Sequence, residues 1–348
     1  MKKIILFIIV SIILCSCKSN DLHTTNYFSS VTIDTLLQDK ISIRALLIDK
    51  EKIWYAADQS RFGCIDLKSN QKKEIQIPAD KNREYRSIAQ TKEHIFILSV
   101  ANPALLYRIS KKDLSYELVY QETHEKVFYD SMQFWNDMEG IAIGDPIEGV
   151  FSLLKTIDGG KTWEKTPAKL LPKLVDGEAA FAASNTNIVV NGDHTWIVSG
   201  GIKSRIFYSK DKAKSWSVYN TPIVQGKQMT GIFTADFYDS KTGFISGGNY
   251  ENLSQNFDNK AQTKDGGTTW ELVAQNQGFG YASCVQYVPN SNGKGLVTVG
   301  ASGFFYSKDG GNSWEQLSSD TSLFTIRFLN NSMAIAAGKN KIIRIQFK

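Results

Sequence analysis

Cysteine and histidine are scarce in this chain, and their scarcity excludes several kinds of site. The 348 residues include four cysteines and four histidines, which form no cluster with metal-site spacing, and no cofactor fingerprint is present. Two of the cysteines precede residue 18, and the other two, Cys64 and Cys284, lie more than 200 residues apart in apolar, strand-like runs. We therefore predict buried thiols at Cys64 and Cys284, no disulfide, no metal and no cofactor.

Long basic runs and membrane-length apolar runs are also missing. The net charge of +5 is mild for this length, and basic residues are not interleaved with aromatic ones, so nucleic acid is not an expected partner. The longest apolar stretch, Ile4 to Leu14, follows Lys2 and Lys3. It is too short to span a bilayer and is typical of the hydrophobic region of an export signal.

The end of that stretch, Leu14-Cys15-Ser16-Cys17, resembles the lipobox of bacterial lipoproteins. The resemblance implies cleavage before Cys17 and stable membrane anchoring through acyl chains on this residue. An ordinary signal peptide is the alternative. Lys18 replaces the aspartate that retains lipoproteins in the inner membrane, which implies an outer-membrane lipoprotein of the cell envelope, facing the periplasm or the surface. The expected segments are a signal at 1–17, a polar tether at 18–30 and one domain at 31–348.

One eight-residue pattern, Ser/Thr-x-Asp-x-Gly-x-Ser/Thr-Trp, returns along the chain. Its copies start at Thr156, Ser209, Thr263 and Ser307, which are 53, 54 and 44 residues apart, and the second copy departs from the pattern. A period of this size is typical of repeat architectures in which each unit packs on its neighbours. The aspartates and tryptophans of the copies are Asp158 and Trp163, Asp211 and Trp216, Asp265 and Trp270, and Asp309 and Trp314.

The surroundings of each copy predict a blade of a β-propeller. A short alternating run precedes and follows each copy, as in a β-hairpin, and two β-branched runs lie upstream, giving four strands per unit. Similar units without the pattern cover 53–77 and 95–120, and 324–347 supplies three more strands. A strand at 31–36 would complete the last unit and remove an exposed edge. We predict an all-β, seven-bladed propeller of four-stranded antiparallel blades closed by the N-terminal strand, with six or eight blades as alternatives.

The residues of the repeated pattern favour a structural role. Aspartate in a tight turn accepts backbone hydrogen bonds, glycine permits positive φ, and tryptophan buries a large ring. The pattern is similar to the Asp-box, or BNR repeat, of sialidases and of many propellers without that activity. The resemblance implies that the turns lie between third and fourth strands, away from the binding face. Lys212 and Ala213 replace glycines in the second copy, which predicts a looser turn.

Candidate site residues are expected on the opposite face. Arg44 and Arg86 each precede the second strand of their unit by nine residues, counted to Ile53 and Ile95, and Asp130 takes about the same place in the third unit. Two arginines and an aspartate on one rim fit an anionic or zwitterionic group. The alternative is a neutralised charge ring that seals the channel. Further rim candidates are Asp145, Glu178, Arg205 and Tyr281, and the polar loop Asn249 to Asn259 is a candidate lid.

Two longer runs carry a second resemblance. FYDSMQFWNDMEGIAIGDPIEGVFSLLKTIDGGKTW, at 128–163, and DGEAAFAASNTNIVV, at 176–190, resemble a bacterial group of Asp-box propellers. That group is related to the photosystem II stability/assembly factors of plants and cyanobacteria. The resemblance covers about 30–348 and implies a propeller, but it implies no common reaction.

Two functions from different classes fit these features. The first is a monomeric, lipid-anchored, non-catalytic binding or assembly module for a protein, peptide or glycan. The second is a sialidase-like glycoside hydrolase, which needs an arginine clamp, a tyrosine nucleophile assisted by a glutamate, and an aspartate acid/base. Its candidate residues are Arg44, Arg86, Arg205 or Arg327, with Tyr281, Glu178, and Asp130 or Asp145. The Arg-Ile-Pro motif of sialidases is replaced by Ser-Ile-Arg-Ala-Leu, which favours the binding module.

Overall fold

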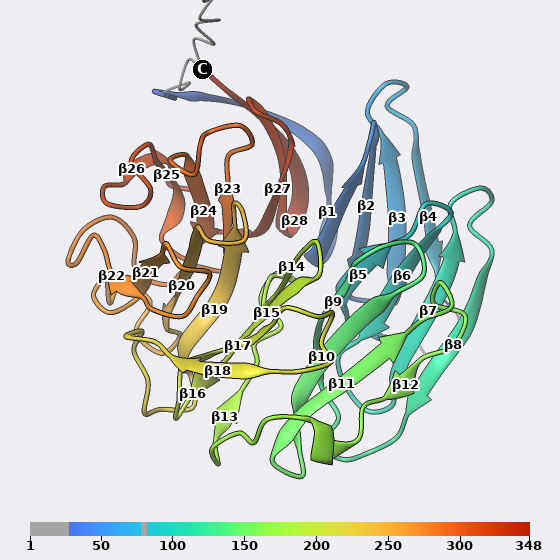
Figure 1. The fold of residues 1–348 in the computed structure, drawn as a ribbon. Coiled ribbons are helices and arrows are strands. Elements are labelled where there is room, and N and C mark those ends of the chain that lie inside the picture. The colour runs from blue at the N-terminus through green and yellow to red at the C-terminus, as the bar shows by residue number, and fades with distance from the viewer. Residues whose placement is uncertain (1–27, 78–81) are drawn as a thin grey trace, which may run out of the picture.

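The computed structural model describes residues 28–77 and 82–348, and nearly all of their regular structure is β. The sheets are arranged around a central axis (Figure 1), and the innermost strands contact one another in a closed ring. In the described ranges one short 3₁₀ helix, Ala168–Leu170, is the single helical element, and none is long and apolar enough to cross a membrane. The prediction of a β-propeller is therefore confirmed.

Sheets of consecutive antiparallel strands form most of the ring. One sheet contains β5 (Tyr85–Gln90), β6 (His94–Ser99), β7 (Ala104–Ser110) and β8 (Tyr116–Glu122), and the next contains β9 (Tyr129–Phe134), β10 (Gly140–Ile147), β11 (Val150–Thr156) and β12 (Glu164–Lys165). A third contains β14 (Ile188–Asn191), β15 (His194–Val198), β17 (Arg205–Ser209) and β18 (Ser217–Asn220). A fourth contains β23 (Cys284–Tyr287), β24 (Leu296–Gly300), β25 (Gly303–Ser307) and β26 (Glu315–Ser318). A further sheet adds two short strands to its inner side, in the order β13 (Glu178–Ala179), β16 (Gly200–Gly201), β19 (Thr230–Phe237), β20 (Gly243–Asn249), β21 (Lys260–Thr263) and β22 (Glu271–Leu272).

The prediction of seven blades is wrong, because the described residues form six hydrogen-bonded sheets. Two long strands, β1 (Val31–Asp49) and β28 (Met333–Phe347), join the units predicted as the first and last blades into one sheet. Neither glycine nor proline interrupts β1, so the chain stays extended from one unit into the other. The order of this sheet is β27 (Leu323–Asn330), β28, β1, β2 (Lys52–Ala57), β3 (Arg61–Asp66) and β4 (Lys72–Gln76).

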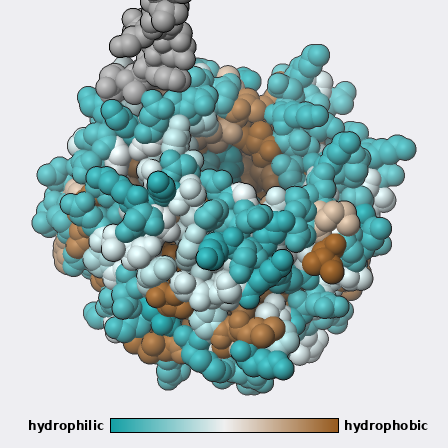
Figure 2. All heavy atoms as spheres, in the orientation of Figure 1, coloured by the Kyte–Doolittle hydropathy of each residue, from teal (hydrophilic) through white to brown (hydrophobic). Residues whose placement is uncertain are grey.

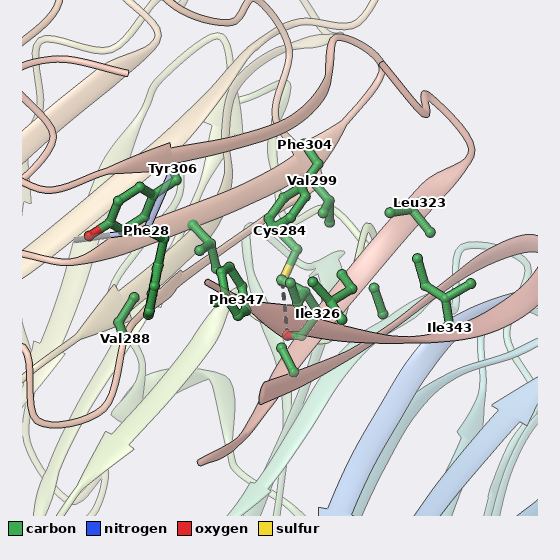
Figure 3. Close-up of a cluster of buried hydrophobic side chains, with 14 residues drawn as sticks. Phe28, Cys284, Val288, Val299, Phe304, Tyr306, Leu323, Ile326, Ile343 and Phe347 are labelled. Atoms are coloured by element: carbon green, nitrogen blue, oxygen red, sulfur yellow. Dashed lines mark hydrogen bonds between the residues drawn. The ribbon is translucent and has the colours of Figure 1, made fainter. Parts of the chain in front are cut away.

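The two ends of the described chain meet within this sheet. Strand β1 pairs antiparallel with β28, from Val31 opposite Phe347 to Ser42 opposite Lys339. Phe28, which the sequence pattern places in the tether, is buried, with its ring 4.6 Å from that of Phe347 (Figure 3). The pairing therefore covers an edge that would otherwise be open to another strand.

Burial follows the position of each strand within its sheet. Middle strands pack between two neighbouring sheets and are apolar on both faces, as the buried rings of Phe96 on β6 and Trp196 on β15 illustrate. Outer strands such as β4 are largely exposed and polar, and Figure 2 shows a mostly hydrophilic surface with scattered hydrophobic patches.

Cys64 and Cys284 are free and buried, as predicted, and the Cys284 thiol lies 3.8 Å from the Ile326 carbonyl oxygen (Figure 3).

The repeated turns share one hydrogen-bond pattern. In the first copy, Asp158 accepts hydrogen bonds from the backbone N–H groups of Lys161 and Thr162 at 3.0 Å and from the Thr162 hydroxyl at 2.7 Å. The hydroxyl of Thr156 donates to Asp158 at 2.9 Å and accepts from the Gly160 N–H at 3.0 Å. Because each turn joins third to fourth strands, it lies at the opposite end of its sheet from the second-to-third loops.

The second copy of the turn is not looser than the others, contrary to expectation. Lys212 and Ala213 adopt φ values of 56° and 58°, so they occupy the left-handed region that glycine favours. Asp211 still accepts the N–H groups of Lys214 and Ser215, at 3.0 and 2.9 Å. Outside contacts hold this backbone, because the Lys212 carbonyl accepts Lys155 Nζ at 2.8 Å and its own Nζ reaches Glu139 at 2.5 Å.

Candidate ligand-binding site

The candidate site begins with β-bulges in the innermost strands. In β1, β5, β9, β19 and β27 the pairing to the next strand skips one residue at a similar position. An unpaired residue of this kind leaves the ladder, and bulges next to sites re-aim a side chain. The skipped residues are Arg44, Arg86, Asp130, Phe233 and Phe324.

A pocket of about 460 Å³ opens beside these bulges. Loops of several sheets complete its wall, and its volume lies in the usual range for small-molecule and peptide-side-chain sites. The lining residues are Arg44, Arg86, Phe128, Asp145, Gly177, Glu178, Ala179, Ala180, Phe181, Ala182, Gln228, Met229, Phe233, Tyr250 and Tyr281.

The segment Ala183 to Asn187 fills the central channel next to this pocket. Its small polar side chains bond to strands all around the ring: Asn185 donates to the Ile88 carbonyl at 2.8 Å, and Thr186 bonds the Thr234 hydroxyl at 2.8 Å. Ser184 donates to the Ser283 carbonyl at 2.7 Å. Hydrogen bonds of this segment, not a ring of neutralising charges, therefore close the channel.

Arg44 is the cation of the site that has no carboxylate partner among the described residues. Its Nη1 donates to the Ala183 carbonyl at 3.1 Å, its guanidinium lies 4.1 Å from the centre of the Phe324 ring, and its buried Nε makes no hydrogen bond. Burial, followed by the nearby charge of Arg86, lowers the pKa of Arg44. An arginine remains charged in such a site, so the missing counter-charge is the main electrostatic feature of the pocket.

Arg86 differs from Arg44 because it has its own carboxylate. Its Nε and Nη2 each lie 2.8 Å from an oxygen of Glu84, two residues earlier in the chain. The pair is only partly buried, and Arg86 also lines the pocket. Arg86 therefore adds hydrogen-bond donors to the wall but little net charge.

Asp130 and Asp145 form the acidic side of the site. Asp130 is fully buried, and within the described part of the chain neither of its carboxylate oxygens makes a hydrogen bond. Asp145 lines the pocket and accepts one hydrogen bond from those residues, from the Ala180 N–H at 3.2 Å. Burial, together with the charge of Asp145, raises the pKa of Asp130 well above its usual range, and the charge of Arg86 opposes that rise. Burial also raises the pKa of Asp145 to about 6. The two carboxyl groups therefore hold less than two negative charges at neutral pH.

Glu178, which belongs to the pocket wall, is neutralised by Arg205 behind it. Arg205 Nε and Nη2 donate to the two Glu178 oxygens at 2.9 and 2.5 Å. The Ser199 hydroxyl and the Val175 N–H also donate to this carboxylate, at 2.6 and 3.0 Å. Glu178 is thus fully engaged, and the tyrosine–glutamate pair that a sialidase needs is not formed with Tyr281.

Aromatic rings line the other side of the pocket. Phe181 and Phe233 stack with centroids 3.9 Å apart, and Tyr281 meets the rings of Phe233 and Tyr250 edge-on at 4.8 and 5.1 Å. Tyr281 is 5% exposed, and burial raises its pKa. We call Phe181, Phe233, Tyr250 and Tyr281 the aromatic half, and Arg44, Arg86, Asp130 and Asp145 the charged half.

The sequence-predicted residues fall into three groups in the structure. Five line the pocket, Asp130 lies at its buried acidic side, and Arg205 lies behind Glu178. The five lining residues are Arg44, Arg86, Asp145, Glu178 and Tyr281. Sequence reasoning missed Phe181 and Phe233 of the aromatic half, whereas Tyr281 was a candidate and Tyr250 belongs to the loop predicted as a lid. That loop stays a prediction; its Leu253 carbonyl accepts the Tyr281 N–H at 2.9 Å.

The fold and site together define a β-propeller with a mixed charged and aromatic pocket at one end of a closed channel. Solved structures of similar fold include YCF48 bound to a D1 peptide, with 13% identity and a TM-score of 0.66 over 92% of this chain and 98% of that chain. The WD40 repeats of RRP9 have 10% identity and a TM-score of 0.65 over 91% of this chain and 97% of that chain. YCF48 from Cyanidioschyzon merolae has 11% identity and a TM-score of 0.61 over 90% of this chain and 98% of that chain. At such identities the likeness shows the fold alone.

No protein-family model matches the chain, and no curated protein matches it in sequence.

Proposed function

We propose that this protein is a non-catalytic binding or assembly module whose ligand enters the pocket and presents an anionic group to Arg44. The observation that carries the proposal is the position of this guanidinium. It is largely buried and makes no ion pair within the described ranges, while the neighbouring Arg86 and Arg205 each have a glutamate. An uncompensated buried charge is costly, and a ligand carboxylate would offset it with charge-assisted hydrogen bonds.

A peptide or protein is the ligand class we favour. The YCF48 propeller, of similar fold, has been solved with a D1 peptide. The aromatic half supplies the apolar area that a peptide side chain needs, and the pocket volume is too small for a folded domain to enter. A partner protein would therefore insert a chain end or a loop.

The test compares N-acetylated hexapeptides that end in a free carboxylate with their C-terminal amides, by isothermal titration calorimetry. Arg44→Met should weaken binding of the carboxylate peptides at least about tenfold and leave the amides unchanged, because one charge-assisted contact is lost. Arg344→Met is the matched control, since Arg344 is a partly exposed arginine paired with Asp34 outside the pocket. Equal loss in both variants, or no loss in Arg44→Met, would refute the proposal.

We also propose that the repeated turns are Asp-boxes with a structural role. The support is their common geometry, in which one aspartate bonds both backbone and hydroxyl groups of the turn. Asp265→Ala should then lower the free energy of unfolding by about 1–2 kcal/mol and leave peptide affinity unchanged. A variant that keeps its stability but loses affinity would contradict this assignment.

A lipid anchor in the outer membrane completes the proposed function. Its support is the lipobox-like run that ends at Cys17, which lies outside the described residues. Cys17→Ser should move the protein from the membrane fraction to the soluble fraction of a bacterial host. Equal membrane retention of both proteins would exclude lipidation at this position.

A further inference from the structure

The charges of the pocket leave one cation and one acidic group unmatched. Arg86 is balanced by Glu84, and Arg205 balances Glu178. Arg44 has no carboxylate within the described part of the chain, and Asp145 meets no cation there within ion-pair distance. A ligand with a single negative charge would balance Arg44 but would leave the acidic group without a partner.

The acidic group is built to accept a hydrogen-bond donor. Asp130 is the extra residue of a bulge in β9, so it leaves the ladder between Tyr129 and Ser131. Two residues earlier, Phe128 lines the pocket, and the Phe128 carbonyl accepts the Asp145 N–H at 2.8 Å, which brings both carboxyl groups to the same corner. Asp130 lies behind the wall, fully buried and without a hydrogen bond within the described residues, whereas Asp145 lines the pocket. Asp145 is therefore the acidic group whose oxygens a ligand donor can reach.

The inner strands set a charged side of the pocket beside an aromatic side, and Arg44 lies where the two meet, close to Tyr281 and Tyr250. Arg44, Arg86 and Asp130 belong to successive inner strands, β1, β5 and β9, whereas Phe233 and Tyr281 come from β19 and the approach to β23 across the channel. A ligand that fits both halves carries its two charges close together at one end. Its other end is an apolar group that packs against aromatic rings.

We propose that the pocket recognises a zwitterionic α-amino acid with an aromatic side chain. The ligand carboxylate bonds Arg44, its ammonium group donates to Asp145 in the pocket wall, and its ring lies in the aromatic half. An ammonium group offers three donors, and the Asp145 carboxyl, which accepts one hydrogen bond within the described ranges, has acceptors left for it. This inference rests on the proposed anion-binding role of Arg44 and adds a second, cationic pole to it.

The test titrates the purified wild-type protein with three probes that differ by one charge. L-Phenylalanine carries both charges, N-acetyl-L-phenylalanine only the carboxylate, and L-phenylalanine amide only the ammonium. We expect phenylalanine to bind at least about tenfold more tightly than either analogue, because each analogue loses one charge-assisted contact in a partly desolvated site. This comparison needs no variant, so it is independent of any effect of mutation on folding.

Two variants then assign the poles. Asp145→Asn should weaken phenylalanine at least about tenfold and leave N-acetyl-phenylalanine unchanged, whereas Arg44→Met should weaken both. If N-acetyl-phenylalanine binds as tightly as phenylalanine and only Arg44→Met weakens it, the cationic pole is refuted and the anion site of the proposed function stands. If the amide binds as tightly as phenylalanine, or if no probe binds, the amino-acid proposal fails, and the peptide titration with Arg44→Met decides separately on the anion site.

Discussion

The buried ion pair between Glu178 and Arg205 allows a quantitative prediction about stability. The Glu178 side chain is 0% exposed and its carboxylate accepts four hydrogen bonds, two of them from Arg205. In Glu178→Gln one oxygen becomes an amide NH₂ group that faces donors. Two hydrogen bonds are then lost, at about 1.5–3 kcal/mol each when one partner is charged.

The expected cost follows from how far Arg205 can recover. Removing one partner of a buried pair costs about 3–5 kcal/mol, because the other charge is left uncompensated. The Arg205 side chain is 16% exposed, so water replaces part of the lost contact. We therefore expect Glu178→Gln to lower the free energy of unfolding by about 3 kcal/mol.

Urea unfolding followed by tryptophan fluorescence measures this change, with the slope of the transition as a check on two-state behaviour. Glu117→Gln is the control, since Glu117 pairs with Arg108 at 2.7 Å but is 59% exposed, and it should cost less than about 1 kcal/mol. Replacing both buried partners, Glu178→Leu with Arg205→Met, should recover most of the loss. A Glu178→Gln protein within about 1 kcal/mol of wild type would refute this reasoning.

Two further predictions concern backbone strain and pH. Gly160→Ala, at φ +74°, places a Cβ 2.2 Å from the buried Phe96 ring, so it should lower the free energy of unfolding by more than about 3 kcal/mol. Gly149→Ala, at φ +73°, meets nothing within 4 Å and should lower it by about 1–2 kcal/mol. Equal losses of stability in urea unfolding would contradict the role of the Phe96 contact. Burial lowers the pKa of Lys260 to about 7. From about pH 7 to 10 Lys260 is therefore protonated in the unfolded state but neutral in the folded state. The free energy of unfolding should then rise by up to about 1.4 kcal/mol per pH unit across this range. Lys260→Met should remove this rise, and parallel stability curves for the two proteins would show that the lysine is not its source.

The hairpins and the rim positions were predictable because both depend on local chemistry. The Thr156 hydroxyl bonds both Asp158 and the Gly160 N–H within four residues, so the turn can be recognised in any copy. Arg44 and Arg86 were placed by their distance to the next strand, which is constant because the bulge recurs at a similar register in each inner strand. The blade count was not predictable, because no residue within β1 marks where one unit ends and the next begins.

The pairing inside the site depends on contacts that no local pattern encodes. Glu178 and Arg205 lie 27 residues apart and belong to different sheets, so their ion pair exists only once these two sheets pack together. The same holds for Phe181 and Phe233, whose stacking joins a loop to a bulge 52 residues later (233 − 181). By contrast, Glu84 precedes Arg86 by two residues, and this neutralisation could have been read from the sequence.

The bulges explain how one fold can carry a pocket of such mixed chemistry. A paired residue in an inner strand must fit between two sheets, so its size and polarity are constrained by packing. The bulge residues Arg44, Asp130 and Phe324 have no partner in the ladder and face the channel end instead. A cation, an acid and a ring can therefore occupy equivalent positions without a change in the sheets. Because equivalent bulges tolerate different side chains, substitutions at these positions should alter which ligand binds while the propeller keeps its fold.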